Sequence, residues 1–425
     1  MLAKLQQIWK AKDIRNKILY VLLLLVIFRV AAHIPVPGIN VGDLRSYFEN
    51  NQVLGLLNLF SGGAMQNFSI VMLGVGPYIT ASIIFQLLVM IVPKLEALQK
   101  EGEYGRQKIN QWTRMLTVPL AFIQGYAFVR LLSSQTGGRF LGDITILQMV
   151  TTLVIVTAGT IFLMWLGELI TEKQIGNGIS LLIFAGIVAR LPQSLLNTVA
   201  AFDQSMVLNL LIFVVIALIT IAVIVLITEG TRNIPVSYAR HVVGQKSVGG
   251  VKTHLPLRVN QAGVIPIIFA ISVILVPPMI AEFFLRSDVS WVASLANWTK
   301  NIFQDQSFYA AIYFLMVFFF TYFYTSVIFK PQQISENLQK QGGFIPGIRP
   351  GRHTSDYLNT VMNRIILAGA LFLGLIAVLP IVVAPITGIQ TLSIGGTSLL
   401  ITVAVVIETV KQIDAQLVMR DYEGF

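Results

Sequence analysis

Long apolar runs separated by short polar segments cover almost the whole chain. A helix needs about 20 apolar residues to cross the hydrocarbon core of a membrane, and ten runs approach or exceed this length, although Arg190 and Pro192 interrupt the fifth. The apolar–polar alternation of β-barrel strands does not occur. The pattern therefore predicts an all-α polytopic membrane protein. Its ten spans are expected near 18–33, 70–92, 115–133, 147–170, 179–200, 207–228, 263–285, 308–329, 362–387 and 392–411.

The second run differs from a simple membrane anchor. Residues 69–88 read SIVMLGVGPYITASIIFQLL and carry Gly74, Gly76, Pro77 and Gln86. We expect Pro77 to kink a helix, and we expect the Gln86 amide to face protein or water because lipid cannot satisfy it. An interrupted helix of this kind either lines a path or a site or is kinked only for packing. The stretch by itself leaves both interpretations open.

Composition excludes a sizeable soluble domain. Of the 425 residues, 55% are hydrophobic and 12% are charged, and the mean hydropathy is +0.75, whereas soluble domains are about 25% charged. The chain has no Cys, which excludes disulfides, thiol chemistry and cysteine-based metal sites. Its four histidines are scattered, and no G-x-S-x-G, H-E-x-x-H or Walker A motif occurs. We therefore expect no enzyme activity, metal or cofactor.

Charge is distributed unevenly between the two sides of the membrane. With the N-terminus inside, ten spans also place the C-terminus inside, and most of the 30 lysines and arginines then lie on the inner side. The formal net charge of +10 is thus mainly a property of the inner side. Part of it simply follows the insertion rule, and the rest is available to acidic lipid, nucleic acid or an acidic partner. The inner segments are 1–17, 93–114, 171–178, 229–262, 330–364 and 411–425.

Acidic residues are almost absent from the middle of the spans. Glu168 and Glu172 lie near the inner end of the fourth run, and Glu408 lies near the inner end of the tenth. We interpret each of them as a capping or packing residue. Because ion-coupled transporters usually carry ionisable groups at mid-membrane, their scarcity argues against ion coupling.

The first 17 residues are basic and partly apolar. Five lysines and arginines precede the first run, and no signal-cleavage site follows it. Leu2, Leu5, Ile8 and Trp9 would share one face of a helix. This pattern predicts either an amphipathic segment on the membrane surface or an unstructured basic tail.

Two inner segments are too long for simple connections, because loops above about 12–15 residues are usually functional or disordered. In 229–262, a strand-like run at Ile234–Tyr238 and a later glycine pair predict a hairpin. In 330–361, the sequence GFIPGIRPGR predicts a turn that displays two arginines, whose planar guanidinium groups suit carboxylate or phosphate. We expect docking loops rather than merely solvated positive loops.

Residues 53–68, VLGLLNLFSGGAMQNF, lie on the outer side between the first two runs. The apolar part is too short to span a membrane, and Gly62 and Gly63 end it. A short helix here either lies on the surface or folds back into the bundle as a re-entrant element.

Several of these stretches together resemble the SecY family, the channel-forming subunits of bacterial Sec protein translocons. Residues 69–88 are similar to the second-helix signature of the family, including its G-x-x-P element and its glutamine. Residues 165–184, WLGELITEKQIGNGISLLIF, resemble its turn between the fourth and fifth helices, except that Gln174 stands where Gly is expected. The sequences THLPLRVNQAGVIP (253–266), FIPGIRPG (344–351) and GGTSLL (395–400) are also similar, so the resemblance covers essentially the whole chain.

The resemblance implies two inverted five-helix halves, 18–200 and 201–411, around an hourglass pore, with 1–17 and 412–425 as cytosolic ends. Spans two and three would part from spans seven and eight to open a lateral gate to lipid. At the constriction, a ring of aliphatic side chains would exclude water and ions by dewetting and would bind a passing peptide only weakly. By the resemblance this ring is Val75, Ile79, Ile183, Ile268 and Ile401.

Without the resemblance, these five residues would be assigned to the core of the bundle. Val75 is smaller than the expected isoleucine, which predicts a slightly looser ring. The resemblance also implies a plug at 53–68 that fills the outer funnel at rest, and a polar cluster at the gate, which is otherwise ordinary interhelical hydrogen bonding. The plug residues are Leu57, Phe60, Ser61, Gly62 and Gly63, and the cluster is Thr80, Gln124 and Asn260.

By the same resemblance, the basic loops would dock the SecA motor ATPase or the ribosome. The docking residues are Arg232, Arg240, Arg349 and Arg352. The small membrane subunits SecE and SecG, signal peptides, preproteins and acidic lipids would be further partners. The expected location is the bacterial cytoplasmic (inner) membrane, with both termini cytosolic.

The implied function is a passive protein-conducting channel that an external motor or the ribosome drives. It would translocate unfolded signal-bearing polypeptides and release transmembrane segments laterally into lipid. The alternative is an inverted-repeat secondary transporter or a lipid transporter. That class explains ten spans and broken helices, but it explains neither two long docking loops nor the lack of mid-membrane charge.

Overall fold

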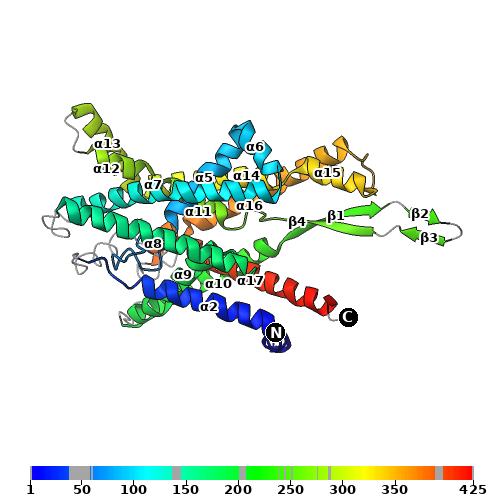
Figure 1. Ribbon diagram of the computed structural model, residues 1–425, viewed down its shortest axis with the longest axis horizontal. Coiled ribbons are helices and arrows are strands. Elements are labelled where there is room, and N and C mark those ends of the chain that lie inside the picture. Colours follow the sequence, from blue (N-terminus) through cyan, green and yellow to red (C-terminus); the bar gives the residue numbers. More distant parts are fainter. Residues whose placement is uncertain are drawn as a thin grey trace.

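The computed structural model is mostly helical, and many of its long helices run roughly along its longest axis (Figure 1). It describes residues 2–37, 58, 61–135, 145–200, 207–238, 240–243, 246–249, 252–274, 276–285, 289–387 and 396–423. In the first half of the chain the helices are α1 (Leu2–Lys10), α2 (Lys12–Ala31), α5 (Gly76–Ile91), α6 (Pro93–Lys100), α7 (Glu103–Gln135), α8 (Ile146–Glu172) and α9 (Gly178–Ala200). The second half contains α10 (Val207–Glu229), α11 (Ile265–Ile274), α12 (Val276–Phe284), α13 (Ser290–Gln304), α14 (Gln306–Ile328), α15 (Pro331–Lys340), α16 (Arg352–Thr387) and α17 (Gly396–Glu423).

Every expected span coincides with one of these helices or, for 263–285, with the pair α11 and α12. The number of crossings is a separate question. Among the described residues, five helices are long and apolar enough to cross a membrane, or six if α5 and α6 count as one bent span. The number ten therefore stays a prediction.

The long helices expose apolar side chains that only lipid or a membrane partner can cover. On α10, the exposed fractions of Leu208, Leu218 and Leu226 are 66%, 62% and 70%. A water-soluble monomer rarely exposes so large a contiguous apolar surface. The chain is therefore a multi-pass membrane protein.

The expectation of a kinked helix over 70–92 is wrong at its N-terminal end. Residues 61–75 form a series of turns, and α5 begins only at Gly76. Pro77 thus lies in the first turn of α5, where its missing N–H removes no helical hydrogen bond. At its other end, α5 bends by 100° into α6.

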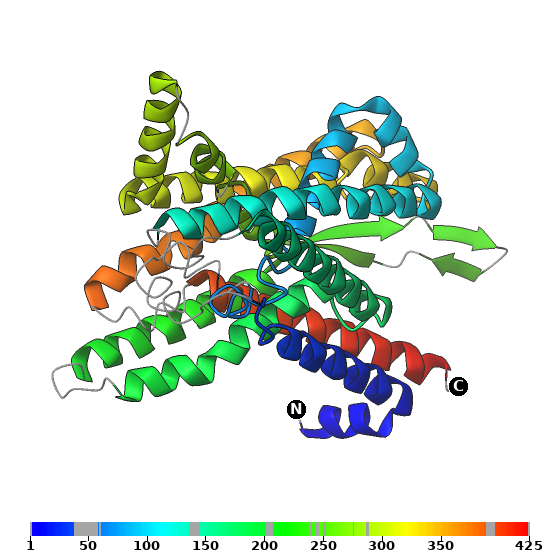
Figure 2. The ribbon, with the colours of Figure 1, turned by 60° about the vertical axis from the view of Figure 1, so that its left-hand side comes forward.

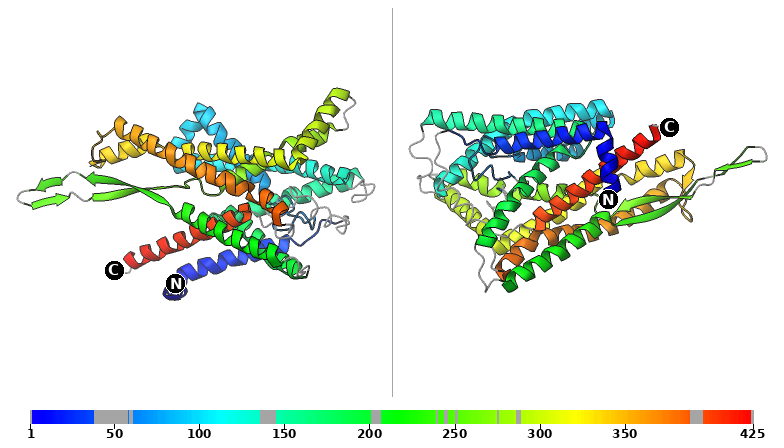
Figure 3. Two further views of the ribbon diagram at one scale, coloured as in Figure 1. Left: turned by 180° about the vertical axis from the view of Figure 1, so that it is seen from behind. Right: turned by 90° about the horizontal axis from the view of Figure 1, so that it is seen from below.

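The hairpin predicted around Ile234–Tyr238 is confirmed, and it is part of a larger sheet. Strand β1 (Thr231–Tyr238) pairs antiparallel with β4 (Lys252–Arg258), and β2 (Arg240–Val243) pairs with β3 (Lys246–Gly249). The short strand β5 (Gly343–Phe344) pairs with the other edge of β1. The two long loops therefore share one three-stranded sheet, which projects from the bundle (Figures 2 and 3).

The two halves of the chain meet along a few helix pairs. α5 contacts α11, α7 contacts α12, and α17 contacts both α2 and α9. The largest hydrophobic cluster draws side chains from both halves, whereas a second cluster, around Phe68, Met72 and Leu132, belongs to the first half alone. The N- and C-terminal ends of the chain lie toward the same end of the molecule as the β1–β4 ribbon (Figure 1).

Candidate functional site

Five aliphatic positions from four helices and one helix cap converge in the largest hydrophobic cluster. Two come from the start of α5, and the others come from α9, α11 and α17, so both halves contribute. All five are buried, and none has a polar side-chain atom that could hold a solute. The residues expected to form the ring, namely Val75, Ile79, Ile183, Ile268 and Ile401, are therefore all members of this one buried cluster.

The described part of the expected plug is buried next to this cluster. Ser61 is 3% exposed, and Ala64 belongs to the same cluster as the five aliphatic residues. Gly62 and Gly63 adopt positive φ angles of 68° and 87°. This part folds back into the bundle and does not lie on its surface. Leu57 and Phe60 lie outside the described residues.

Two arginines contact this buried segment. Arg29 Nη1 donates to the carbonyl oxygen of Gly62 at 2.6 Å, and Arg190 Nη2 donates to Gln66 Oε1 at 2.6 Å. The sequence predicted neither contact: Arg190 was noted only as an interruption of the fifth apolar run, and Arg29 falls outside the segments assigned to the inner side. The sequence did contain a clue to these contacts, because a charged side chain near the end of an apolar span needs a polar partner.

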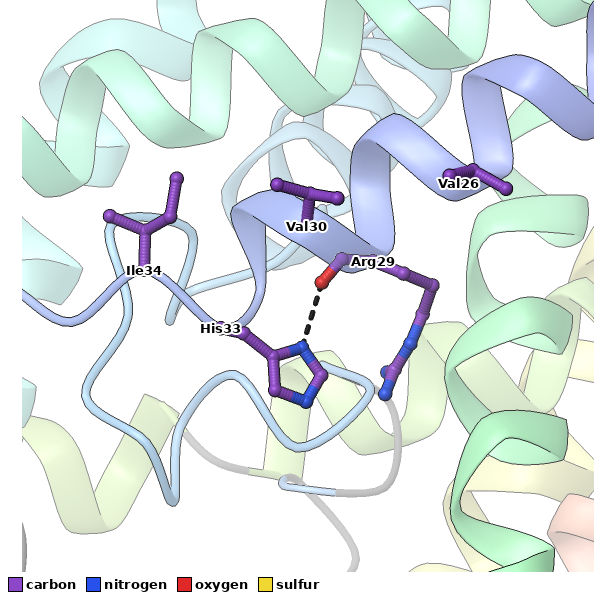
Figure 4. A pocket seen from close by; sticks show the side chains of 5 residues that line it. All are labelled: Val26, Arg29, Val30, His33 and Ile34. Atoms are coloured by element: carbon purple, nitrogen blue, oxygen red, sulfur yellow. Dashed lines mark hydrogen bonds between the residues drawn. The ribbon is translucent and has the colours of Figure 1, made fainter.

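An open groove of about 490 Å³ lies beside Arg29, at the C-terminal end of α2 (Figure 4). His33 Nδ1 lies 2.8 Å from the carbonyl oxygen of Arg29, to which it donates. The rest of the lining is apolar, and none of it belongs to the aliphatic ring. The lining residues are Val26, Arg29, Val30, His33 and Ile34.

The expected polar cluster is only partly assembled. Gln124 Nε2 on α7 donates to Thr80 Oγ1 on α5 at 3.3 Å, which links two helices of the first half. Asn260 instead donates locally to the Gly263 carbonyl oxygen at 3.2 Å. Its buried Oδ1 has no hydrogen-bond partner among the described residues. Thr80 and Gln124 therefore meet as expected, whereas no hydrogen bond joins Asn260 to them.

Acidic residues near the helix ends pair across helices. Glu168 on α8 accepts a hydrogen bond from Arg114 Nε on α7 at 2.6 Å, and Glu229 at the end of α10 pairs with Lys411 on α17 at 2.8 Å. The two ion pairs tie helices together. Gln86, expected to face protein or water, donates to Ser82 one turn earlier on α5.

The expected docking residues lie on β1, on β2, in the loop after β5 and at the start of α16. Arg232 on β1, Arg349 in the loop and Arg352 at the start of α16 are exposed, and Arg240 lies on β2. Beneath them, Ile234, Leu257 and other side chains of both loops form one hydrophobic cluster with α16. The sequence predicted two separate loops and did not predict that β5 joins them.

A family model described as SecY matches residues 69–410 of this chain. The chain belongs to the SecY family. The protein translocase subunit SecY of Streptomyces galbus is 43% identical over 443 residues, which cover 100% of both chains. That of Mycobacterium tuberculosis strain H37Rv is 44% identical over 437 residues, which cover 97% of each.

Solved structures show the same fold. One described as a protein-conducting channel has a TM-score of 0.62 at 18% identity and covers 93% of this chain and 90% of its own. A SecY structure, described as one whose plug domain stabilises the closed channel and maintains a membrane seal, has a TM-score of 0.58 at 18% identity, with 92% and 90% covered. Sec61 in a canine ribosome–channel complex has a TM-score of 0.59 at 18% identity, with 93% and 90% covered.

SecY family membership decides between the two classes left open above. A protein translocase subunit is a channel component, and a secondary transporter or a lipid transporter is not expected in this family. The geometry agrees, because the convergent residues are aliphatic and offer no polar group to bind a solute.

Proposed function

We propose that this chain forms a protein-conducting channel that moves unfolded, signal-bearing polypeptides across a membrane and releases transmembrane segments sideways into lipid. The observation that carries the proposal is that five buried aliphatic side chains from both halves belong to one cluster, next to a buried segment that folds back into the bundle. The relatives named protein translocase subunits support it.

The five aliphatic residues would act as the constriction. Their methyl groups exclude water and ions when no polypeptide is present, because a narrow apolar passage dewets. They make no hydrogen bond to a passing peptide, so an extended chain moves through without being held. Residues 53–68 would be the plug that covers the ring at rest.

The lateral gate would lie where α5 and α7 part from α11, α12 and α14, the helices of spans seven and eight. On that side the halves touch through α5–α11 and α7–α12. The Gln124–Thr80 hydrogen bond and the incompletely bonded Asn260 lie at its helices. An apolar signal helix opens the gate if it binds the open state better than the closed one.

The energy for movement would come from outside the chain, since no Walker A motif occurs in its sequence. We propose that the arginines of the shared sheet and its loop dock the SecA motor ATPase or the ribosome. A relative in fold, Sec61, occurs in a ribosome–channel complex. SecE, SecG, signal peptides, preproteins and acidic lipids are the other proposed partners.

The proposed orientation places both termini and the shared sheet in the cytosol of a bacterium, with the chain in the inner membrane. The N-terminus, the C-terminus and the ribbon lie toward one end of the molecule (Figure 1). The segments of the sequence that this orientation puts inside carry most of its lysines and arginines, which supports the proposal by the positive-inside rule.

The test is reconstitution in liposomes with SecE, SecG, SecA, ATP and a signal-bearing preprotein, with protection from added protease as the readout. Protection that needs both ATP and the signal supports the channel. Absence of protection, in vesicles where a known translocon works, contradicts it.

Replacing Ile79 and Ile268 together by Gly should widen the ring. We expect the resting ion conductance of the channel in planar bilayers to rise, because two aliphatic side chains that exclude water are lost. The matched control replaces Leu218 and Leu226, which are exposed on α10. Unchanged conductance in the Ile79→Gly, Ile268→Gly protein would mean that these residues are core residues of the bundle and do not form a constriction.

A further inference from the structure

Two charged hydrogen bonds hold the segment proposed as the plug. Arg29 near the end of α2 donates to the backbone of Gly62, and Arg190 on α9 donates to the side chain of Gln66, each at 2.6 Å. Hydrogen bonds from a guanidinium are roughly twice as strong as neutral ones. Their acceptors lie only four residues apart in the sequence.

The acceptor Gln66 belongs to a small internal network that also includes Gly63, the neighbour of the acceptor Gly62. Asn58 Nδ2 donates to Gln66 Oε1 at 3.0 Å, the Gln66 N–H donates to Asn58 Oδ1 at 3.0 Å, and the Gly63 N–H donates to the Asn58 carbonyl oxygen at 2.8 Å. Asn58 and Gln66 are both buried. The network links residue 58 to residues 63 and 66, so a contact of Arg190 with Gln66 also restrains these residues.

Gly62 brings the segment against the backbone of α9. Its φ of +68° favours glycine, and a Cβ there would lie 2.9 Å from the Cα of Gly186 and 3.2 Å from Arg29 Nη1. Only a residue without a side chain fits at this distance. The approach also sets the position of the carbonyl oxygen that Arg29 binds.

All of these partners belong to the first half of the chain. Arg29 is on α2, and Gly186 and Arg190 are on α9. Further along the segment, Met65 and Phe68 pack in the cluster that only the first half supplies. α17 of the second half also contacts α2 and α9, but at the proposed gate the halves touch elsewhere, at α5–α11 and α7–α12. Separating them at that contact leaves the arginine contacts in place.

We propose that Arg29 and Arg190 form a clasp that keeps the plug attached to the first half, so that gate opening and plug displacement are separate steps. This rests on the proposed function of residues 53–68. The two arginines are positioning residues, because they bind the plug and leave the ring to contact the polypeptide. Removing one charged donor should raise the displaced population of the plug about tenfold.

The natural chain contains no Cys, so one introduced thiol reports on the plug. Ser61→Cys places it at a position that is 3% exposed. In right-side-out vesicles without preprotein, we expect a membrane-impermeant maleimide to label this thiol about tenfold faster when Arg29→Met or Arg190→Met is added. The matched control is Arg130→Met, an exposed arginine of α7 that bonds to Tyr126; its labelling rate should not change.

Two conservative variants separate a lost donor from general loosening. Arg29→Lys keeps one charged donor and should label more slowly than Arg29→Met. Gln66→Glu gives Arg190 a carboxylate and should label more slowly than the parent, an effect that misfolding cannot produce. If Arg29→Met and Arg190→Met both label at the parental rate, the clasp is overturned. If Gln66→Glu labels at the parental rate or faster, the clasp is also overturned, and this result does not depend on whether the two Met variants accumulate.

The same vesicles distinguish failure of the clasp from failure of the proposed function. If the Ser61→Cys parent shows no signal-dependent translocation while a known translocon does, the channel proposal fails, whatever the labelling rates are. If the parent translocates, labelling alone decides on the clasp. If gate opening and plug displacement are separate steps, Gln124→Leu at the gate should leave the labelling rate without preprotein at the parental value. A tenfold rise in that rate would show that the two steps are coupled.

Discussion

At the residue scale, Gln174 occupies a backbone conformation that favours glycine. Its φ is +59°, and this left-handed region costs a residue with a Cβ about 1–2 kcal/mol. The Gln174 carbonyl oxygen accepts a hydrogen bond from Gln416 Nε2 at 2.6 Å, and Lys17 Nζ donates to Gln416 Oε1 at 3.3 Å. The turn between α8 and α9 is thereby tied to α17 and α2, although the residue departs from the family pattern.

We expect Gln174→Gly to stabilise the folded protein by about 1 kcal/mol, because it relieves the left-handed conformation and its exposed side chain has little packing to lose. The thermal unfolding midpoint in detergent measures this. The matched control is Gln107→Gly at an exposed position of α7, which should destabilise by about 1 kcal/mol. An equal loss at both positions would show that Gln174 is not strained.

Single side chains were easier to predict from the sequence than their partners. Thr80 and Gln124 were assigned to one cluster and do bond to each other. Arg190 was recognised only as a charge, because its partner Gln66 lies 124 residues earlier in the chain. Hydropathy identifies a charge that needs a partner, but it does not identify which distant segment supplies one.

At the element scale, α8 determines the path of the turns before α5. A Cβ on Gly159 would lie 1.9 Å from the carbonyl oxygen of Ile70, so the backbone of residues 70–71 lies directly against this helix. No side chain fits there without moving one of the two elements.

Gly159→Ala should therefore displace residues 70–71 and destabilise the protein by more than about 1 kcal/mol. Gly76→Ala is the control, because a Cβ on this first residue of α5 meets nothing within 4 Å. Detergent unfolding curves of the two variants give the comparison. Similar midpoints for both would contradict the close approach.

Hydropathy located all the long helices but not where the second one begins. Residues 70–75, IVMLGV, are as apolar as a membrane span, although they form turns packed inside the bundle. Pro77 is compatible with a kink or with a helix start, and only the structure decides for the start. Strand β5 is two residues long, too short for any sequence pattern to indicate its pairing with β1.

The loop that carries Arg349 gives a prediction at the same scale. Arg349→Glu should abolish export driven by the motor ATPase while the protein still folds and inserts, because the reversed charge repels an acidic docking surface. Lys340→Glu makes the same change of charge in the last turn of α15 and should retain export. Normal export by Arg349→Glu would contradict the docking assignment.

At the scale of the whole molecule, the polar residues expected at the gate come from both halves, although the hydrogen bonds described for them stay within one half. Replacing Thr80, Gln124 and Asn260 by Leu removes interactions worth about 0.6–2 kcal/mol each in membranes. We expect a change in which weak signal sequences are accepted, measured by export of preproteins with graded signal hydrophobicity. Thr151→Leu, at an exposed threonine of α8 bonded only within its helix, is the control. Unchanged selectivity in the triple variant would make the cluster purely structural.

The arrangement of the halves was predicted only through the family resemblance. Nothing in the spacing of Ile183 and Ile401 indicates that they share one cluster, because aliphatic residues are the default in any helix of a membrane bundle. Which residues far apart in the sequence come to share a cluster depends on how the helices pack, and the apolar pattern of each helix does not contain this information.

The three-stranded sheet also has a mechanical consequence. Strand β1 rises over eight residues, about 26 Å, and a short connection joins the base of its partner β4 to α11. A force applied near the far end of the ribbon, for example by a bound partner, is therefore transmitted along β4 to the first residues of α11. Strand β5, which precedes α16 in the chain, pairs with β1. The same force therefore also reaches the first residues of α16, so it acts on α11 and α16 together.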